Sequence, residues 1–178
     1  MDDLVVKAML KWPNVPDCHG WLGLDERGDW YMRDAQTQAR GSFKSGCLLG
    51  DKLTKGSKLE HEKLIAFIGR NYGCETHSNG QESWFFQNGP QKVYVDLAAT
   101  PYIWRLEVGG VDIGPTINSH TGLVTDYRSC YLDCADRLYI VTTLGLGLVH
   151  TLDMHIAADA IEQGYWTLEP EKPSEAET

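Results

Sequence analysis

The chain has 178 residues, of which 42% are hydrophobic, 23% charged and 10% aromatic, a balance that is typical of a folded protein and too apolar for a disordered one. Sixteen Lys and Arg residues against 25 Asp and Glu residues give a formal net charge of −9, which disfavours a broad nucleic-acid or anionic-membrane surface. No apolar run approaches the roughly 20 residues that a bilayer-spanning helix needs. We therefore expect neither nucleic acid nor membrane as a partner.

The two ends of the chain are both polar. The N-terminus opens with Asp2 and Asp3, and Lys7 and Lys11 interrupt the apolar residues that follow. A secretory signal has a basic start and a longer apolar core, so we expect a cytoplasmic protein. Residues 169–178 have no side chain suited to anchor them to a core, which predicts a disordered acidic tail.

The first elements in chain order are a hairpin and a loop. Apolar residues at both ends of 21–33 flank the turn-forming residues 25–29, and this pattern predicts a β-hairpin. Residues 34–56 contain glycines among Ser, Thr and Lys residues, without helical or strand periodicity. They predict a long irregular or mobile loop, which is uncommon unless it is functional or disordered.

A helix is predicted over residues 57–72. Ser57 and Glu60 match a capping box, in which each side chain binds a backbone N–H of the first turn. Gly73 suits the residue that closes the helix in a left-handed conformation. The apolar stripe of this helix comprises Leu64, Phe67, Ile68 and Tyr72, at the spacing that faces one side.

Three strands follow, and then the composition changes. Residues 84–86, 92–97 and 102–108 alternate or carry dense aromatic side chains, and their short connections favour an antiparallel meander. Residues 112–122 are rich in Gly, Pro, Thr, Ser and Asn and are predicted to join two subdomains. Residues 138–152 then predict a second hairpin around Gly145.

A second helix is predicted over residues 153–163, so the chain reads helix, meander, hairpin, helix. This order predicts an α+β fold with mostly antiparallel β-meander and hairpins and two helices packed on the sheets. The expected organisation is a subdomain at 12–110 with the first helix and the meander, a smaller one at 111–168 with the hairpin and second helix, and the tail at 169–178.

Four blocks of the chain resemble a known family. They are residues 12–24, 59–72 and 84–91, and the segment from Gly147 to Ala160. In them the chain resembles conserved proteobacterial proteins that are classed only as a domain of unknown function. That resemblance implies no reaction and no catalytic residue. The layout of elements also resembles another uncharacterised bacterial family suspected of signalling, and such a likeness of fold does not fix function.

A candidate metal site lies at the start of the second helix. His150, Asp153 and His155 form an H-x-x-D-x-H pattern, and imidazole and carboxylate groups suit zinc or iron. His120 or Cys134 is a candidate for the further ligand. Asp153 is equally suited to cap the helix by accepting backbone N–H groups, in which case the two histidines simply flank it.

The cysteines offer a weaker zinc hypothesis. Their number is odd, at five, and they have no framework spacing, so free thiols are expected in a reducing compartment. Cys130 and Cys134 are separated by three residues, and Cys18 with His19 would have to complete a zinc knuckle. We therefore expect no cofactor, with zinc as the alternative.

Aromatic residues gather on the predicted central strands. A sheet has two faces and one helix covers only one of them, so part of this aromatic surface is a candidate for a small-molecule pocket or a protein interface. The alternative is that the helices and the first hairpin bury both faces. The candidate ligand-binding residues are Trp84, Phe86, Gln87, Tyr94, Tyr102 and Trp104.

These patterns favour a non-catalytic cytoplasmic module that binds a small ligand or a protein partner, in sensing or signalling. No P-loop or nucleophile-elbow motif is present, so an enzyme is the less favoured interpretation. The competing hypothesis is a metal-assisted hydrolase that uses His150, Asp153 and His155. Homodimerisation through an exposed sheet edge is compatible with either.

Overall fold

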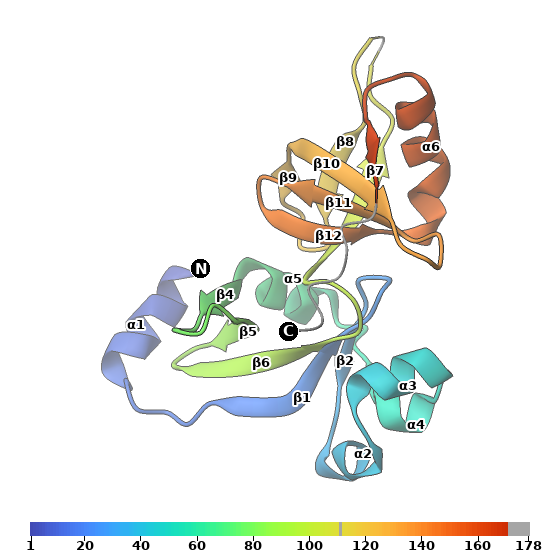
Figure 1. The fold of residues 1–178 in the computed structure, drawn as a ribbon. Coiled ribbons are helices and arrows are strands. Elements are labelled where there is room, and N and C mark those ends of the chain that lie inside the picture. Colours follow the sequence, from blue (N-terminus) through green and yellow to red (C-terminus); the bar gives the residue numbers. More distant parts are fainter. Residues whose placement is uncertain (111, 171–178) are drawn as a thin grey trace. The chain divides into compact units, whose positions relative to one another are not determined.

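The structure is a computed structural model that describes residues 1–110 and 112–170 (Figure 1). The chain forms two compact units, Met1–Pro101 and a second unit that starts at Tyr102. Each unit contains a mixed β-sheet with helices, so the predicted α+β fold is confirmed. We expected the boundary after residue 110, whereas the chain divides after Pro101, because the strand that begins at Tyr102 belongs to the sheet of the second unit.

The first unit is built on a six-stranded sheet with the order β3-β2-β1-β6-β5-β4. The central pair β1 and β6 is parallel and the other neighbours are antiparallel. Its helices are α1 (Asp3–Lys11), α2 (Ala35–Arg40), α3 (Phe43–Leu49), α4 (Lys52–Lys55) and α5 (Glu62–Arg70). Its strands are β1 (Cys18–Leu24), β2 (Trp30–Met32), β3 (Ser57–Lys58), β4 (Tyr72–Thr76), β5 (Glu82–Asn88) and β6 (Gln91–Leu97).

Helix α5 packs on one face of this sheet and forms the core of the unit. Ile68 is buried against side chains from β1, β2, β5 and β6, as the apolar stripe predicted. The helix is shorter than predicted and its capping box is wrong. Ser57 lies in edge strand β3, and the side chain of His61 accepts the N–H of Leu64 instead. The remaining buried members of this core are Leu22, Leu24, Trp30, Phe86 and Val95.

Residues 34–56 form three short helices, so the predicted irregular loop is wrong. Asp34, Ser42 and Asp51 each accept a backbone N–H at the start of α2, α3 and α4, and a glycine follows each helix. Helices of four to seven residues are too short to show an apolar period, because a period is read over 11 to 18 residues. Their capping residues were therefore the available signal.

Helix α3 attaches this group to the sheet face opposite α5. The ring of Phe43, which is buried, lies over Gly23 of β1, where an added Cβ would come within 2.6 Å of the ring. Glycine at this strand position permits the close approach, because it has no side chain to displace the ring.

The second unit has a seven-stranded sheet in the order β13-β10-β11-β12-β7-β8-β9. The predicted hairpin is confirmed as the antiparallel pair β11–β12, and the second helix as the 3₁₀ turn η1 followed by α6. These elements are β7 (Tyr102–Glu107), β8 (Thr116–Ser119), β9 (Val124–Thr125), β10 (Tyr127–Leu132), β11 (Leu138–Thr142), β12 (Gly145–Val149), η1 (Thr151–Asp153), α6 (Met154–Glu162) and β13 (Leu168–Glu169).

The neighbours predicted for the third strand of the meander are wrong. β7 pairs in parallel with β12 and antiparallel with β8, and it does not join β5 and β6. The meander of the first unit is instead β4–β5–β6. Sequence alternation shows which residues of a strand share a face, and it does not show which strand lies beside it.

The predicted tail begins within an ordered element. Leu168–Glu169 forms β13 and pairs with β10, while residues 171–178 of the predicted tail lie outside the described residues. Across 1–110 and 112–170, no helix combines the length and the apolar character needed to cross a bilayer.

Candidate functional site

The six predicted ligand-binding residues do not form one surface. Trp84, Phe86 and Gln87 lie on β5 and Tyr94 lies on β6, all in the first unit. Tyr102 and Trp104 lie on β7, in the second unit. The four that share a sheet also point to two different faces. Ligand binding by any of them stays a prediction, and their surroundings differ.

Phe86 and Trp84 lie on the α5 side of the first sheet. Phe86 is buried and meets Phe67 of α5 edge-to-face, with ring centroids 5.4 Å apart. Trp84 is half-buried and its ring lies 5.1 Å from that of Tyr72. Gln87 is buried, and its side-chain Nε2 donates to the carbonyl of Gly89 at 2.9 Å. Gln87 therefore holds the β5–β6 turn.

Tyr94 lies on the opposite face and belongs to a polar cluster. Its hydroxyl donates to Glu75, whose carboxylate also pairs with Lys92, and its ring stacks on His19 with centroids 4.3 Å apart. The hydrogen bond to Glu75 raises the pKa of Tyr94 to about 12. The phenol therefore stays protonated at neutral pH and acts as a donor.

Tyr102 and Trp104 are core residues of the second unit. Trp104 is fully buried, and its indole Nε1 donates to the Ile140 carbonyl at 2.9 Å. The two rings stack with centroids 5.1 Å apart, and Tyr102 is also buried. Gly147 provides the space, because a Cβ there would come within 2.4 Å of the Trp104 ring.

Two of the three predicted metal residues, His150 and Asp153, form hydrogen bonds at the start of the second helix. His150 is buried and its Nδ1 accepts the N–H of Leu152. The carboxylate of Asp153 accepts from the Arg105 guanidinium at 2.6 Å and from the Leu106 N–H at 3.0 Å. His155 is exposed. The structure therefore uses Asp153 to bind β7 to the helix start.

The further ligand candidates do not complete a site. Burial lowers the pKa of His120 to about 4, so this imidazole is neutral at physiological pH. Cys134 is exposed, whereas Cys130 is buried and its thiol donates to the Thr167 carbonyl at 3.5 Å. Within the part of the chain that the structure describes, no three His, Cys, Asp or Glu side chains are grouped so as to hold a metal ion.

An apolar cavity of about 260 Å³ lies between α5 and the first sheet. Trp21, Met32 and Leu64 stand at its mouth, because 42%, 43% and 38% of these residues remain exposed. Burial raises the pKa of Cys18, so its thiol carries no charge at neutral pH. The described residues that line the cavity are Cys18, Trp21, Leu22, Met32, Leu64, Ile68, Phe86, Asn88, Gln91 and Val93.

Of these lining residues, only Phe86 was among the predicted ligand-binding residues. Leu64 and Ile68 lie in the predicted apolar stripe, and Trp21 and Met32 lie in the predicted hairpin, but none of the four was predicted to bind a ligand. The sequence predicted a longer helix over residues 57–72, whereas in the structure a helix of nine residues faces a six-stranded sheet. Such a helix is about 14 Å long and covers only part of the face.

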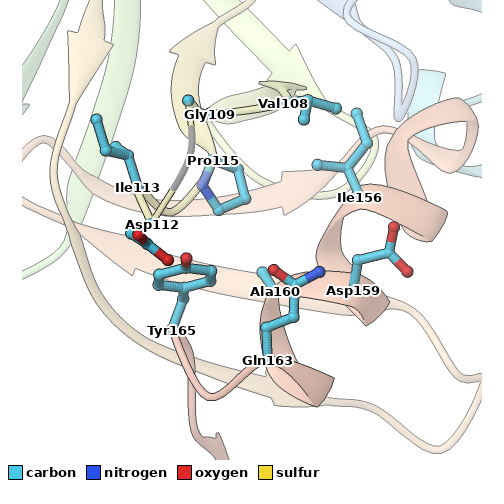
Figure 2. Close-up of a pocket in the computed structure, with 11 residues that line it drawn as sticks. Val108, Gly109, Asp112, Ile113, Pro115, Ile156, Asp159, Ala160, Gln163 and Tyr165 are labelled. Atoms are coloured by element: carbon cyan, nitrogen blue, oxygen red, sulfur yellow. The ribbon is translucent and has the colours of Figure 1, made fainter.

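A second cavity, of about 250 Å³, lies in the second unit beside α6. Figure 2 shows Ile156 and Asp159 of α6, and Gln163 directly after the helix, on one side. Asp112 and Ile113, which lie between β7 and β8, are on the opposite side (Figure 2). Two carboxylates and a glutamine share this lining with apolar groups, so it is the more polar of the two cavities.

The comparison with protein families decides the chain's membership. The model of the DUF2944 family, described as "Protein of unknown function (DUF2946)", matches residues 1–177. The chain belongs to this family. The resemblance to a family classed only by unknown function is thereby confirmed. The family's description names no reaction, and no curated protein matches the chain.

Two solved structures are similar to this member of the DUF2944 family, and both are DUF1285 family proteins. The protein from Silicibacter pomeroyi DSS-3 is 12% identical, with a TM-score of 0.50, and the match covers 89% of this chain and 84% of that one. The protein from Shewanella baltica OS155 is 14% identical, with a TM-score of 0.49, covering 79% of this chain and 91% of that one. At such identity, the first of these likenesses concerns the fold alone.

Proposed function

We propose that this protein is a non-catalytic module that binds a small apolar molecule in the cavity between α5 and the first sheet. The observation that carries the proposal is the exposed apolar mouth of this cavity. Trp21, Met32 and Leu64 leave about two fifths of their surface in water while the cavity behind them stays open. Concave apolar surface of this kind is typical of small-molecule sites.

The size of the cavity limits the ligand. A protein cavity of about 150 Å³ lined by apolar side chains accepts benzene, which has six non-hydrogen atoms. By the same ratio, the 260 Å³ found here admits about ten non-hydrogen atoms. A bicyclic aromatic or a branched aliphatic molecule fits this size.

The lining chemistry favours a neutral ligand. None of the described lining residues carries a charge at neutral pH, and the polar groups are the side-chain amides of Asn88 and Gln91 and the thiol of Cys18. Gln91 is held in place, because its Nε2 donates to the Pro16 carbonyl at 2.9 Å. A single hydroxyl, carbonyl or N–H on the ligand suits these groups. The lining offers no general base beside the thiol, which supports binding over catalysis.

The affinity expected from this size is modest. At about −0.5 kcal/mol per non-hydrogen atom, between the values for very small and drug-sized ligands, ten atoms supply about −5 kcal/mol. That corresponds to a Kd of about 0.2 mM. Probes must therefore be used at concentrations up to several millimolar.

The test follows the indole N–H signals of the ¹⁵N-labelled protein by NMR, with unlabelled indole and cyclohexylmethanol as probes. Trp21→Phe assigns the signal of Trp21 among the six tryptophans. We expect the Trp21 signal to shift with saturation below 5 mM probe. The signal of Trp104, whose indole is buried in the second unit, is expected to stay fixed.

Two variants decide whether the cavity is responsible. Leu64→Glu places a carboxylate at the mouth and is expected to weaken probe binding at least tenfold, because a charge there loses hydration when the ligand enters. Leu53→Glu is the matched control on α4, where Leu53 is 65% exposed. No Trp21 shift with either probe at 5 mM, or equal weakening by the two variants, would refute the proposal.

A further inference from the structure

A different cavity, of about 600 Å³, lies on the side of β2 that faces α3 and α4. Its described lining residues are Arg27, Tyr31, Cys47, Gly50, Lys52, Lys55, Gly56 and Lys58. Four of these eight are Lys or Arg and none is Asp or Glu, in a chain whose formal net charge is −9. A concave surface with one sign of charge concentrates ligands of the opposite sign.

The cationic side chains exceed the carboxylates that neutralise them. Asp25 pairs with Lys55 at 2.7 Å and Asp29 pairs with Lys58 at 2.6 Å. Across residues 1–110 and 112–170, no ion pair involves Arg27 or Lys52, both of which are exposed. The lining therefore keeps two positive charges that no carboxylate pairs with.

The remaining groups add no negative charge to the lining. Burial raises the pKa of Cys47 to about 11, so its thiol is protonated at neutral pH. Glu26 influences that thiol electrostatically, but Glu26 is not among the lining residues. The cavity thus presents cations, one phenol ring and a neutral thiol.

Two of the cations are held in place by one buried carboxylate. Asp25 is 2% exposed, and its Oδ1 accepts the N–H groups of Arg27 and Asp29, each at 2.9 Å. Its Oδ2 accepts from Lys55, whose Nζ also lies 4.2 Å from the centre of the Tyr31 ring. An ammonium group has three donors; Asp25 and the Tyr31 hydroxyl take two of them, and Lys55 retains one for a ligand. Asp25 therefore fixes both the turn that carries Arg27 and the position of Lys55.

We propose that this cavity binds a small molecule through a diphosphate group. Arg27 is suited to a bidentate contact with phosphate oxygens, and Lys52, Lys55 and Lys58 supply further donors around the same space. By the ratio used for the apolar cavity, 600 Å³ admits about 24 non-hydrogen atoms. That is close to the size of a nucleoside diphosphate. This inference is independent of the apolar site, which lies on the other face of the sheet.

The experiment is isothermal titration calorimetry of the full chain, in 50 mM NaCl, with inorganic pyrophosphate, ADP and inorganic phosphate. Arg27→Gln/Lys52→Gln removes the two unpaired cations. Lys7→Gln/Lys63→Gln, at exposed positions on α1 and α5, is the control with the same change in net charge. Lys55 is left intact, because its loss would leave Asp25 buried without its cation.

We expect pyrophosphate to bind more tightly than phosphate. The affinity for pyrophosphate is expected to be at least tenfold lower in Arg27→Gln/Lys52→Gln and within twofold of wild type in the control variant. Raising the NaCl concentration to 200 mM is expected to weaken pyrophosphate binding to the wild-type protein. Tighter binding of ADP than of pyrophosphate assigns the site to a diphosphate ester, and the reverse assigns it to the inorganic anion. The proposal is overturned if neither pyrophosphate nor ADP binds with a Kd below 5 mM. It is also overturned if the control variant loses as much affinity as Arg27→Gln/Lys52→Gln.

Discussion

Arg33 is the residue whose replacement tests most directly how the first unit holds α2, α3 and α4. It follows β2 and is 3% exposed. Its Nε donates to the Thr54 carbonyl at 3.1 Å, and one terminal nitrogen donates to the Gly41 carbonyl. The other terminal nitrogen lies 3.2 Å from the Asp96 carboxylate on β6. One side chain thus connects the ends of α2 and α4 to the sheet.

The cost of Arg33→Gln is worked out contact by contact. The Thr54 and Gly41 carbonyls each lose a charged donor, and each loss contributes about 1.5 kcal/mol. The ion pair with Asp96, whose side chain is 43% exposed, adds about 0.5 kcal/mol after screening by solvent. The contact to the Gly20 carbonyl, at 3.5 Å, is too long to count. The sum is about 3.5 kcal/mol.

Hydrogen exchange read by mass spectrometry measures this value where it acts. A loss of about 3.5 kcal/mol in local stability lowers amide protection some 300-fold, since about 1.4 kcal/mol corresponds to a factor of ten. We expect that loss in peptides from residues 35–55, and unchanged protection in peptides from β11 and β12. Arg40→Gln, at an exposed position on α2, is the control. A loss below tenfold in Arg33→Gln, or an equal loss in the control, would show that this reasoning is wrong.

Two further predictions concern single contacts. Burial by itself raises the pKa of Asp153, but Arg105 and its other donors outweigh burial and leave the pKa below 3.8. The stability that Asp153 supplies is therefore complete above pH 5 and is lost as the pH falls through the lowered pKa. The urea midpoints of Asp153→Asn and of the wild type are therefore expected to differ at pH 7 and to converge toward pH 3. Gly23→Ala places a Cβ within 2.6 Å of the Phe43 ring, whereas at Gly73 the nearest atom to an added Cβ is 3.8 Å away. We expect thermal unfolding to show a loss of about 1–3 kcal/mol in stability for Gly23→Ala and a much smaller loss for Gly73→Ala. Equal losses in the two variants would contradict this packing.

The elements predicted correctly from sequence are those whose own residues contain the whole signal. The β1–β2 and β11–β12 hairpins have alternating residues around a turn, and α5 and α6 have apolar stripes that meet a sheet. The capping box at Ser57 failed because Ser57 pairs with Met32 in an edge strand. A tertiary contact outweighed a local preference of about 1 kcal/mol.

The candidate site was less predictable, because it depends on which strands become neighbours. Trp84 and Trp104 both lie on strands with dense aromatic residues, yet they belong to different sheets. One is half-buried and the other is fully buried. The basic cavity is formed by Arg27, Lys52 and Lys58, which are far apart in the sequence and meet because residues 34–56 fold into helices. Because residues 34–56 were interpreted as a loop, the sequence could not predict that these three side chains meet.

The two proposed sites share strand β2, and the alternation of that strand explains how. Tyr31 lines the basic cavity and Met32 lines the apolar one, because successive residues of a strand point to opposite faces. Arg33 then anchors the strand end to α2 and α4. A strand of three residues therefore contributes a lining residue to a cavity on each face of the sheet, and Arg33 at its end fixes the position of both.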